Sequence, residues 1–172
     1  QDNRIVVGLS GGVDSAVVAA LLLDRGYDVH GVILETWRAP EALREATPSD
    51  AQESAQAVAD HLGIPLIRRD VRQAFFERIV RPFANAYAAG RTPNPCTLCN
   101  PMLKLAALLE EADAHDAFWV ATGHYARVIR CANLSRVARA RAGAKDQSYA
   151  LYRLSQPQLR RLLLPLGDVE SK

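Results

Sequence analysis

The Gly-Gly turn near the start of the chain constrains the fold more than any other sequence feature. Residues 4–9, "RIVVGL", are short, apolar and β-branched, which is typical of a strand buried on both faces. "SGGVDS" follows directly at 10–15, and a helical pattern extends from Asp14 to Arg25. A strand, a glycine turn and a helix form the layout of a phosphate-binding loop, because glycine lets an anion approach the backbone and a helix N-terminus favours negative charge.

The rest of the chain continues to alternate between strand and helix patterns. The apolar stripe of the first helix is predicted to contain Val13, Val17, Val18, Leu21 and Leu22. Further strands are expected at 27–34, 64–70 and 117–122, and further helices at 49–63, 72–90 and 102–115. Residues 38–48 are expected to form a loop, with Ser49 or Asp50 capping the next helix. This order predicts a three-layer α/β fold with a Rossmann-like parallel sheet, which binds ligands beyond the carboxyl ends of its strands.

The composition is that of one globular domain without a membrane span. The 172 residues are 49% hydrophobic, which is enough for a sizeable core. No apolar run approaches the roughly 18 residues that a membrane span needs, so no membrane partner is expected. The net charge is only +2, so a polyanionic partner would have to bind a local basic patch. Three cysteines, an odd number, without a secretory leader favour a reducing, cytoplasmic location.

Two interpretations of "SGGVDS" follow from its residue types. In the first, backbone amides from Gly11 to Ser15 point at one anion, and the hydroxyls of Ser10 and Ser15 add donors. This loop differs from the G-x-x-x-x-G-K-[ST] phosphate loop because it contains no lysine. In the second interpretation the stretch is only a tight turn, with Ser10 or Asp14 as the helix cap.

The complete S-G-G-x-D-S string resembles that of the PP-loop ATP pyrophosphatases. This resemblance implies the adenine nucleotide α-hydrolase-like fold and cleavage of ATP into AMP and pyrophosphate. It also implies that Asp14 helps to position Mg²⁺, a hard cation suited to carboxylate oxygens, although Asp14 could be a cap alone. Leu34 would supply an apolar face to the adenine. The implied nucleotide-binding residues are Gly8, Leu9, Ser10, Gly11, Gly12, Val13, Asp14, Ser15, Leu34 and Gly123.

A stiff thiol loop, "GRTPNPCTLCN", occupies residues 90–100. Cys96 and Cys99 form a C-x-x-C pair just before a predicted helix, and a helix N-terminus lowers the pKa of a thiol. Arg91 could add to that effect. A structural zinc site needs about four ligands, so one pair is insufficient. A dithiol redox pair and a sulfur-handling nucleophile are the other two interpretations.

Three motifs narrow the resemblance. "GRTPNPCTLCN", "ATGHYAR" (121–127) and "AKDQSYALY" (144–152) follow the glycine motif in the order found in bacterial tRNA-uridine 2-sulfurtransferases, the MnmA family. The resemblance implies that ATP adenylates O2 of the wobble uridine of tRNA and that a cysteine-borne sulfur then displaces AMP, giving 2-thiouridine. Cys99 matches the family's nucleophile. Cys96 stands where some members have aspartate, and would be a thiol assistant or, with Cys99, a ligand of an iron–sulfur cluster, which needs three or four thiolates.

The same resemblance implies the tRNA contacts and the partners. The implied tRNA-contacting residues are Asn94, Pro95, Cys96, His124, Lys145, Asp146 and Gln147. From the residues alone, His124 could be an ordinary loop histidine, and Asp146 or Ser148 could cap an apolar helix. An upstream sulfur-carrier protein would deliver the sulfur, and a second catalytic cysteine would lie beyond this chain. We expect a catalytic domain at 1–166 and the start of a linker at 167–172. The alternatives are another PP-loop adenylating enzyme and a non-catalytic nucleotide-binding module.

A one-signed basic run lies between Asp116 and Asp146, an interval without acidic residues. Its members are Arg127, Arg130, Arg136, Arg139, Arg141 and Lys145. Such a run beside a candidate site favours binding of a phosphate backbone, although charge runs are often only solvated surfaces. Cys131, in the same interval, is expected to be structural and to lie in a turn between short strands.

Overall fold

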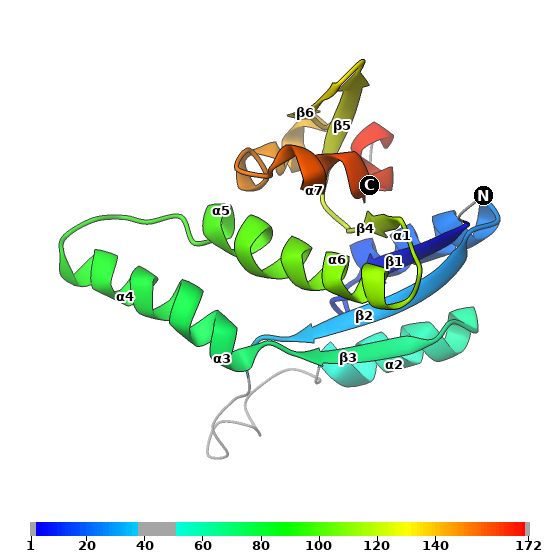
Figure 1. The fold of residues 1–172 in the computed structure, drawn as a ribbon, viewed down its shortest axis with the longest axis horizontal. Coiled ribbons are helices and arrows are strands. Elements are labelled where there is room, and N and C mark those ends of the chain that lie inside the picture. Colours follow the sequence, from blue (N-terminus) through cyan, green and yellow to red (C-terminus); the bar gives the residue numbers. More distant parts are fainter. Residues whose placement is uncertain (1–2, 38–50, 171–172) are drawn as a thin grey trace.

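A five-stranded parallel sheet forms the centre of the molecule (Figure 1). The computed structural model describes residues 3–37 and 51–170, so the loop expected at 38–48 and the caps expected at Ser49 and Asp50 lie outside the described residues. The strand order is β3-β2-β1-β4-β7. The strands are β1 (Arg4–Gly8), β2 (Asp28–Glu35), β3 (Leu66–Asp70), β4 (Trp119–Ala121) and β7 (Leu162–Leu163). The predicted α/β fold class is confirmed.

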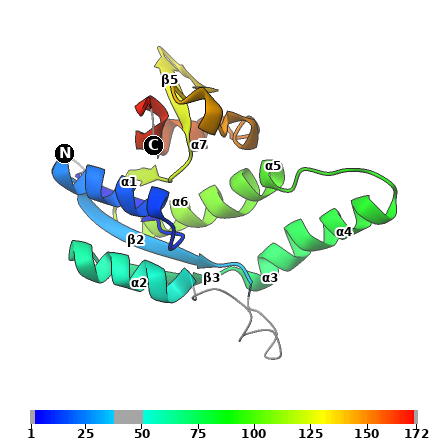
Figure 2. The same cartoon turned by 180° about the vertical axis from the view of Figure 1, so that it is seen from behind.

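Helices cover both faces of this sheet, giving three layers (Figures 1 and 2). Helices α1 (Val13–Asp24) and α2 (Ala51–Leu62) pack on one face, where Val18 and Leu22 meet Ile5 and Val29 of the sheet. Helices α6 (Leu105–Ala114) and α7 (Gln156–Arg161) contribute to the second core, on the other face. Strands buried on both faces explain why their sequences are continuously apolar.

The buried face of α1 differs from the predicted stripe. Val18 and Leu22 are buried as expected, but Val13 is 68% exposed and Val17 is also exposed. The buried positions are instead Ser15, Val18, Ala19 and Leu22. The glycine turn decides the rotation of the helix, because it directs Ser15 inward to bond with the loop, and this turns Val13 and Val17 outward.

The thiol pair belongs to the first turn of a long helix. This helix consists of α5 (Cys96–Cys99), a π turn η3 (Asn100–Lys104) and α6, so it begins at Cys96 instead of the expected residue 102. The helix at 72–90 was expected and contains α3 (Arg72–Phe75), η2 (Phe76–Val80) and α4 (Arg81–Ala88). It projects away from the sheet, and residues 89–95, which include Pro93 and Pro95, return the chain to α5 (Figure 1).

A two-stranded hairpin follows β4 and lies outside the main sheet (Figure 1). It is formed by β5 (Ala126–Cys131) and β6 (Leu134–Arg139), and Cys131, which was expected in the turn, is instead the exposed last residue of β5. The apolar helix expected after residue 147 is absent from this described region. Short 3-10 turns, η4 (Gly143–Lys145) and η5 (Ser148–Ala150), occupy it instead, and α7 begins only after the capping box of Ser155. A last 3-10 turn, η6, is at Pro165–Asp168.

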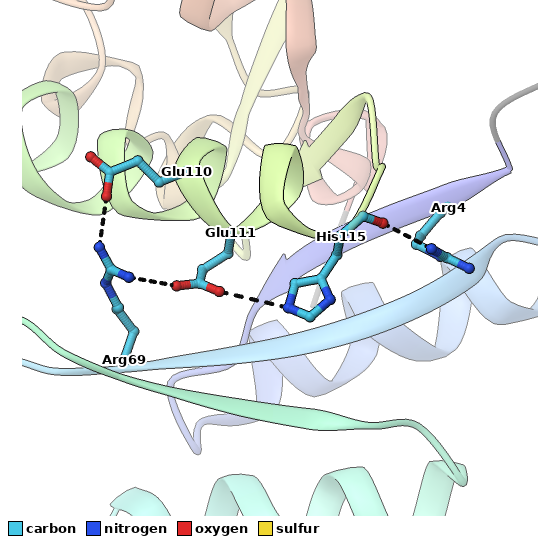
Figure 3. A network of polar contacts seen from close by, with 5 residues as sticks. All are labelled: Arg4, Arg69, Glu110, Glu111 and His115. Carbon is cyan, nitrogen blue, oxygen red and sulfur yellow. Dashed lines mark hydrogen bonds and ion pairs between the residues drawn. The ribbon is translucent and has the colours of Figure 1, made fainter.

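A chain of polar contacts fastens α6 to the sheet (Figure 3). The Arg69 guanidinium on β3 lies 2.8 Å from Glu110 Oε2 and 3.0 Å from Glu111 Oε1, both on α6. Glu111 also lies 3.8 Å from His115 Nε2, and Arg4 on β1 donates to the His115 carbonyl oxygen at 2.8 Å. Because these contacts reach two strands, they fix the helix whose other end carries the thiols.

Within residues 3–37 and 51–170, no helix has the length and apolar character needed to cross a membrane.

Candidate active site

The glycine loop uses its two glycines for different purposes. Gly11 has a φ of +76°, and a Cβ there would lie 2.6 Å from the carbonyl oxygen of Ala51. Only glycine fits that conformation and that approach. Gly12 has an ordinary φ of −92°, and among the described residues a Cβ would have only Ser10 Oγ within 4 Å, at 3.5 Å. The first glycine is therefore required by the turn, whereas a Cβ at the second would meet only an ordinary contact.

Hydrogen bonds inside the loop fix its shape. Ser15 Oγ accepts a bond from the Ser10 amide at 3.1 Å and donates to the Gly12 carbonyl oxygen at 2.9 Å. Ser10 Oγ lies 3.2 Å from Ser15 Oγ and accepts from the Gly12 amide at 3.4 Å. Because the Ser15 proton is directed to Gly12, this hydroxyl supports the loop. Ser10, which is exposed, remains the candidate side-chain donor to an anion.

A cavity of about 410 Å³ lies where β1, β2 and β4 end. The structure brings into its lining these residues singled out from the sequence: Gly8, Leu9, Ser10, Asp14, Ser15, Leu34, Gly123, His124 and Gln147. The remaining lining consists of Val32, Ile33, Thr36, Ala51, Lys104, Leu108 and Thr122. Apolar side chains and a few polar groups converging at strand ends are typical of a ligand site in this fold.

The other sequence-predicted residues do not line this cavity. They are Gly11, Gly12, Val13, Asn94, Pro95, Cys96, Cys99, Lys145 and Asp146. Asn94 has a local role, because its Oδ1 accepts from the Cys96 amide at 3.1 Å and its carbonyl oxygen accepts from the Thr97 hydroxyl at 2.9 Å. These bonds begin the thiol-bearing helix. The nucleotide roles of Gly11, Gly12 and Val13 and the tRNA roles of the rest stay predictions.

The first turn of α1 is fitted closely to the segment after β4. A Cβ on Gly123 would lie 3.0 Å from the Ser15 amide nitrogen, so glycine is needed for this packing. Tyr125 Oη donates to Asp14 Oδ1 at 3.3 Å, so Asp14 is placed at the cavity wall by a tyrosine that the sequence did not single out. Two hydrogen bonds join Tyr125 to Gln147. The Gln147 backbone amide donates to the Tyr125 carbonyl oxygen at 2.7 Å, and the Tyr125 backbone amide donates to Gln147 Oε1 at 3.0 Å.

His124 is held neutral at the cavity. Burial, and to a smaller degree the charge of Lys104, lower the pKa of His124 to about 4. Thr122 Oγ1 lies 2.8 Å from His124 Nδ1, and if the hydroxyl donates, the imidazole proton is on Nε2. A neutral imidazole can donate a hydrogen bond but adds no positive charge to the cavity.

Asp146 stabilises the segment between the hairpin and η5. Its carboxylate accepts from the Ala140 amide at 2.8 Å and from the Ser148 hydroxyl at 2.7 Å. These bonds hold the backbone in turns, which is the physical reason why no apolar helix begins here. Lys145 is exposed.

The two thiols have different surroundings, and the expectation of a lowered thiol pKa is wrong for Cys99. Cys96 is exposed, whereas Cys99 is only 7% exposed. Burial raises the pKa of the Cys99 thiol above its ordinary value, because the thiolate loses hydration. The charge that opposes this rise belongs to Lys104, not to Arg91.

Lys104 is the functional candidate that sequence reasoning missed. It lies in the cavity lining and acts electrostatically on both Cys99 and His124. In the sequence it is one lysine in an apolar helical pattern, "MLKLAALL", and nothing there indicates that the helix is interrupted by a π turn.

The basic run is divided between structural and free side chains. Arg130 donates to the Leu162 carbonyl oxygen at 2.7 Å, and its guanidinium lies 5.3 Å from the Trp119 ring centroid. Arg141 pairs with Asp168 at 3.1 Å. Arg136 is exposed, with no ion pair to another described residue. Some arginines of the run therefore stabilise the fold. The predicted tRNA contact applies mainly to exposed residues such as Arg136.

The described residues fit Mg²⁺ better than they fit an iron–sulfur cluster. No group of three or more His, Cys, Asp or Glu side chains in the described part of the chain could hold a metal ion. Cys96 and Cys99 alone are too few thiolates for an iron–sulfur cluster, so the described donors do not fit one. Asp14 offers a carboxylate at the cavity, which fits Mg²⁺ bound jointly by protein and phosphate oxygens.

The five-stranded parallel sheet with helices on both faces is a doubly wound α/β fold, and the cavity lies at the carboxyl ends of its strands. The chain belongs to the family of the tRNA methyl transferase HUP domain, whose model matches residues 3–172.

Proteins with similar sequences carry the name of the family that the motifs resemble. The chain is 48% identical over 169 residues to the tRNA-specific 2-thiouridylase MnmA of Sorangium cellulosum, covering 96% of this chain and 44% of that protein. It is 44% identical over 172 residues to the protein of the same name from Syntrophotalea carbinolica, covering 100% of this chain and 49% of that protein. The chain thus spans somewhat less than half the length of these relatives.

Two solved structures share the fold at low sequence identity. A predicted subunit of tRNA methyltransferase from Methanocaldococcus jannaschii matches 95% of this chain and 67% of its own, with a TM-score of 0.51 and 16% identity. The U34-tRNA thiolase NcsA from Methanococcus maripaludis, determined with its [4Fe-4S] cluster, matches 72% of this chain and 39% of its own, with a TM-score of 0.50 and 21% identity.

Proposed function

We propose that this chain is the ATP- and tRNA-binding part of a tRNA-uridine 2-sulfurtransferase. O2 of the wobble uridine attacks the α-phosphorus of ATP, and pyrophosphate leaves. The outer sulfur of a persulfide, carried by a second cysteine beyond this chain, then attacks C2 of the adenylated uridine, and AMP leaves with the former O2. The Cys99 thiolate attacks the inner sulfur of the persulfide, so the S–S bond to the nucleoside sulfur breaks, 2-thiouridine is released and a disulfide remains between the two cysteines. The observation that carries the proposal is the cavity at the ends of β1, β2 and β4, formed by the glycine loop, the "ATGHYAR" motif and the thiol-bearing helix together.

The side chains of the cavity suit the parts of a nucleotide. Leu34, with Val32 and Ile33, gives an apolar wall for the adenine. The glycine loop, whose Gly12 amide makes only a long 3.4 Å bond to Ser10 Oγ, and the first turn of α1 suit the phosphates. Asp14 would hold Mg²⁺ beside them, and the ion would withdraw charge from the phosphate oxygens as pyrophosphate leaves.

Cys99 and Cys96 are the proposed sulfur-transfer residues. Cys99 is buried in the first turn of its helix, and Cys96 is exposed one turn earlier. The proposed tRNA contacts are Asn94, Pro95, His124, Lys145, Asp146 and Gln147. Similar proteins named tRNA-specific 2-thiouridylase support tRNA as the substrate, and an upstream sulfur-carrier protein would be the donor. We propose residues 1–166 as the catalytic domain and 167–172 as the start of a linker.

The test identifies the products formed from ATP in the presence and in the absence of tRNA. Incubation with α-labelled and γ-labelled ATP is expected to give AMP and pyrophosphate, and to do so faster when tRNA is present. Formation of ADP and orthophosphate contradicts the proposal. Binding of ATP without release of pyrophosphate, even with tRNA, indicates instead a non-catalytic nucleotide-binding module.

Cys99→Ser separates the two steps. In the full-length protein with a sulfur donor, this variant should still adenylate tRNA but should form no 2-thiouridine. Cys131→Ser is the matched control, because Cys131 is exposed in the hairpin and outside the cavity. Loss of adenylation in Cys99→Ser, or retention of thiolation, would place the sulfur step elsewhere.

A further inference from the structure

We propose that Lys104 is a further nucleotide-binding residue, whose ammonium group contacts the phosphates of the nucleotide from the thiol-bearing helix. The inference deepens the proposed function, since it takes ATP as the ligand. Lys104 supplies, from a separate helix, the positive charge that the S-G-G-x-D-S loop lacks.

The charges of the cavity lining are the first observation. Among residues 3–37 and 51–170, the charged side chains in the lining are those of Asp14 and Lys104, since His124 is neutral near pH 7. No carboxylate in the described part of the chain forms an ion pair with Lys104. An unpaired ammonium in a cavity that also holds a helix N-terminus favours an anionic ligand.

The π turn is the second observation, because it brings the cavity-lining Lys104 closer to the side of the helix that carries Cys99. The Leu105 amide donates to the Asn100 carbonyl oxygen, five residues back. In an uninterrupted α-helix, Lys104 and Cys99 would be separated by about 140° around the axis. A π turn contains an additional residue and so brings residues five apart closer to one side of the helix. The buried Cys99 and the cavity-lining Lys104 are such a pair.

The electrostatic contacts of Lys104 agree with this placement. Its charge acts on the Cys99 thiol and on the His124 imidazole, which belong to two different parts of the site. Lys104 therefore lines the cavity and is also close enough to the thiol for its charge to act there. A phosphate held by its ammonium would lie on the side of the nucleotide nearest the thiol-bearing helix.

The experiment compares ligand binding by the wild type, Lys104→Met and Lys104→Arg. Lys104→Met should weaken Mg-ATP binding about tenfold in calorimetric titration, whereas Lys104→Arg should retain most of the affinity. Adenosine, which has no phosphates, should bind the wild type and Lys104→Met equally. Arg25→Gln is the matched control, because it removes one exposed positive charge outside this cavity and should leave ATP affinity unchanged.

The alkylation rate of Cys99 is the second readout. In a Cys96→Ser, Cys131→Ser background, Lys104→Met should slow alkylation by iodoacetamide at fixed pH, because the thiolate loses its nearby positive charge. A variant that merely loosened the helix would expose the thiol and speed the reaction. Equal ATP affinity of the wild type and Lys104→Met would overturn this inference alone. Failure of the wild type to bind ATP would overturn the proposed function together with it.

Discussion

Asn100 Nδ2 donates a 3.0 Å hydrogen bond to the carbonyl oxygen of Ala150, and this joins the thiol-bearing helix to the segment after Gln147. Asn100 is only 2% exposed, and its Oδ1 is buried without a hydrogen-bond partner among the described residues. The two motifs that contain these residues are fifty positions apart in sequence, so this single side chain has a large share in holding them together.

Replacing Asn100 should therefore destabilise the fold. Asn100→Ala leaves the Ala150 carbonyl oxygen buried without a donor, which should lower the free energy of unfolding by about 1–3 kcal/mol. Urea denaturation followed by circular dichroism measures the change. Asn133→Ala, at the exposed turn of the hairpin, is the control and should change stability by less than about 0.5 kcal/mol. Equal stability of Asn100→Ala and the wild type would contradict the structural role.

Gly11→Ala should be more harmful than Gly26→Ala. Both glycines have positive φ, +76° and +82°, but a Cβ on Gly26 meets nothing within 4 Å while one on Gly11 meets Ala51. Gly26→Ala should cost about 1–2 kcal/mol from backbone strain alone. Gly11→Ala carries the same strain and a clash, so its unfolding free energy should fall further. Similar losses in the two variants would show that the loop moves away from Ala51 easily.

The neutral state of His124 predicts a pH dependence of stability. Its pKa is about 4 in the folded protein and 6.5 in its ordinary state, so between these values the unfolded chain binds more protons. Stability from this group is complete above pH 6.5 and falls as the pH is lowered towards 4. Between about pH 7.5 and about pH 5 it should account for about 2 kcal/mol.

His124→Gln should flatten this dependence, which urea denaturation at the two pH values would measure. Burial also lowers the pKa of His30, so His30 contributes to the pH dependence of stability with the same sign. His30→Gln is the control, because it removes that separate contribution and leaves the contribution of His124 in place. If His124→Gln and the wild type lose the same stability on acidification, His124 is not held neutral by the fold.

Arg136→Glu tests the basic surface of the hairpin. Arg136 is exposed, unlike Arg130, whose guanidinium bonds backbone carbonyl oxygens. If Arg136 contacts a phosphate, reversal of its charge should weaken tRNA binding, and the slope of log affinity against log salt should fall by about one. Filter binding at several salt concentrations measures both, with Arg25→Glu as the control. An unchanged salt dependence would remove Arg136 from the tRNA surface.

The strands and the glycine loop could be predicted because their sequences carry local signals. Continuous β-branched runs indicated β1 and β2, and Gly11 has the positive φ for which glycine is selected. Gly123 could be placed at the site because the carboxyl ends of parallel strands share one edge, whereas Leu34 was implied by the family resemblance.

The remaining features depend on tertiary structure. The outward orientation of Val13 follows from the bonds of Ser15, which set the rotation of α1. The raised pKa of Cys99 follows from burial, which a loop sequence does not reveal. The position of Lys104 follows from a π turn whose sequence resembles an ordinary helix.

The central position of β1 between β2 and β4 has a consequence for cooperativity. The cavity takes its walls from segments as distant as Gly8 and Gln147, so one bound molecule would contact parts of the fold that are far apart in sequence. Local opening of either part would then require release of that molecule. Occupancy should therefore slow amide hydrogen exchange throughout the sheet as well as in the loop itself.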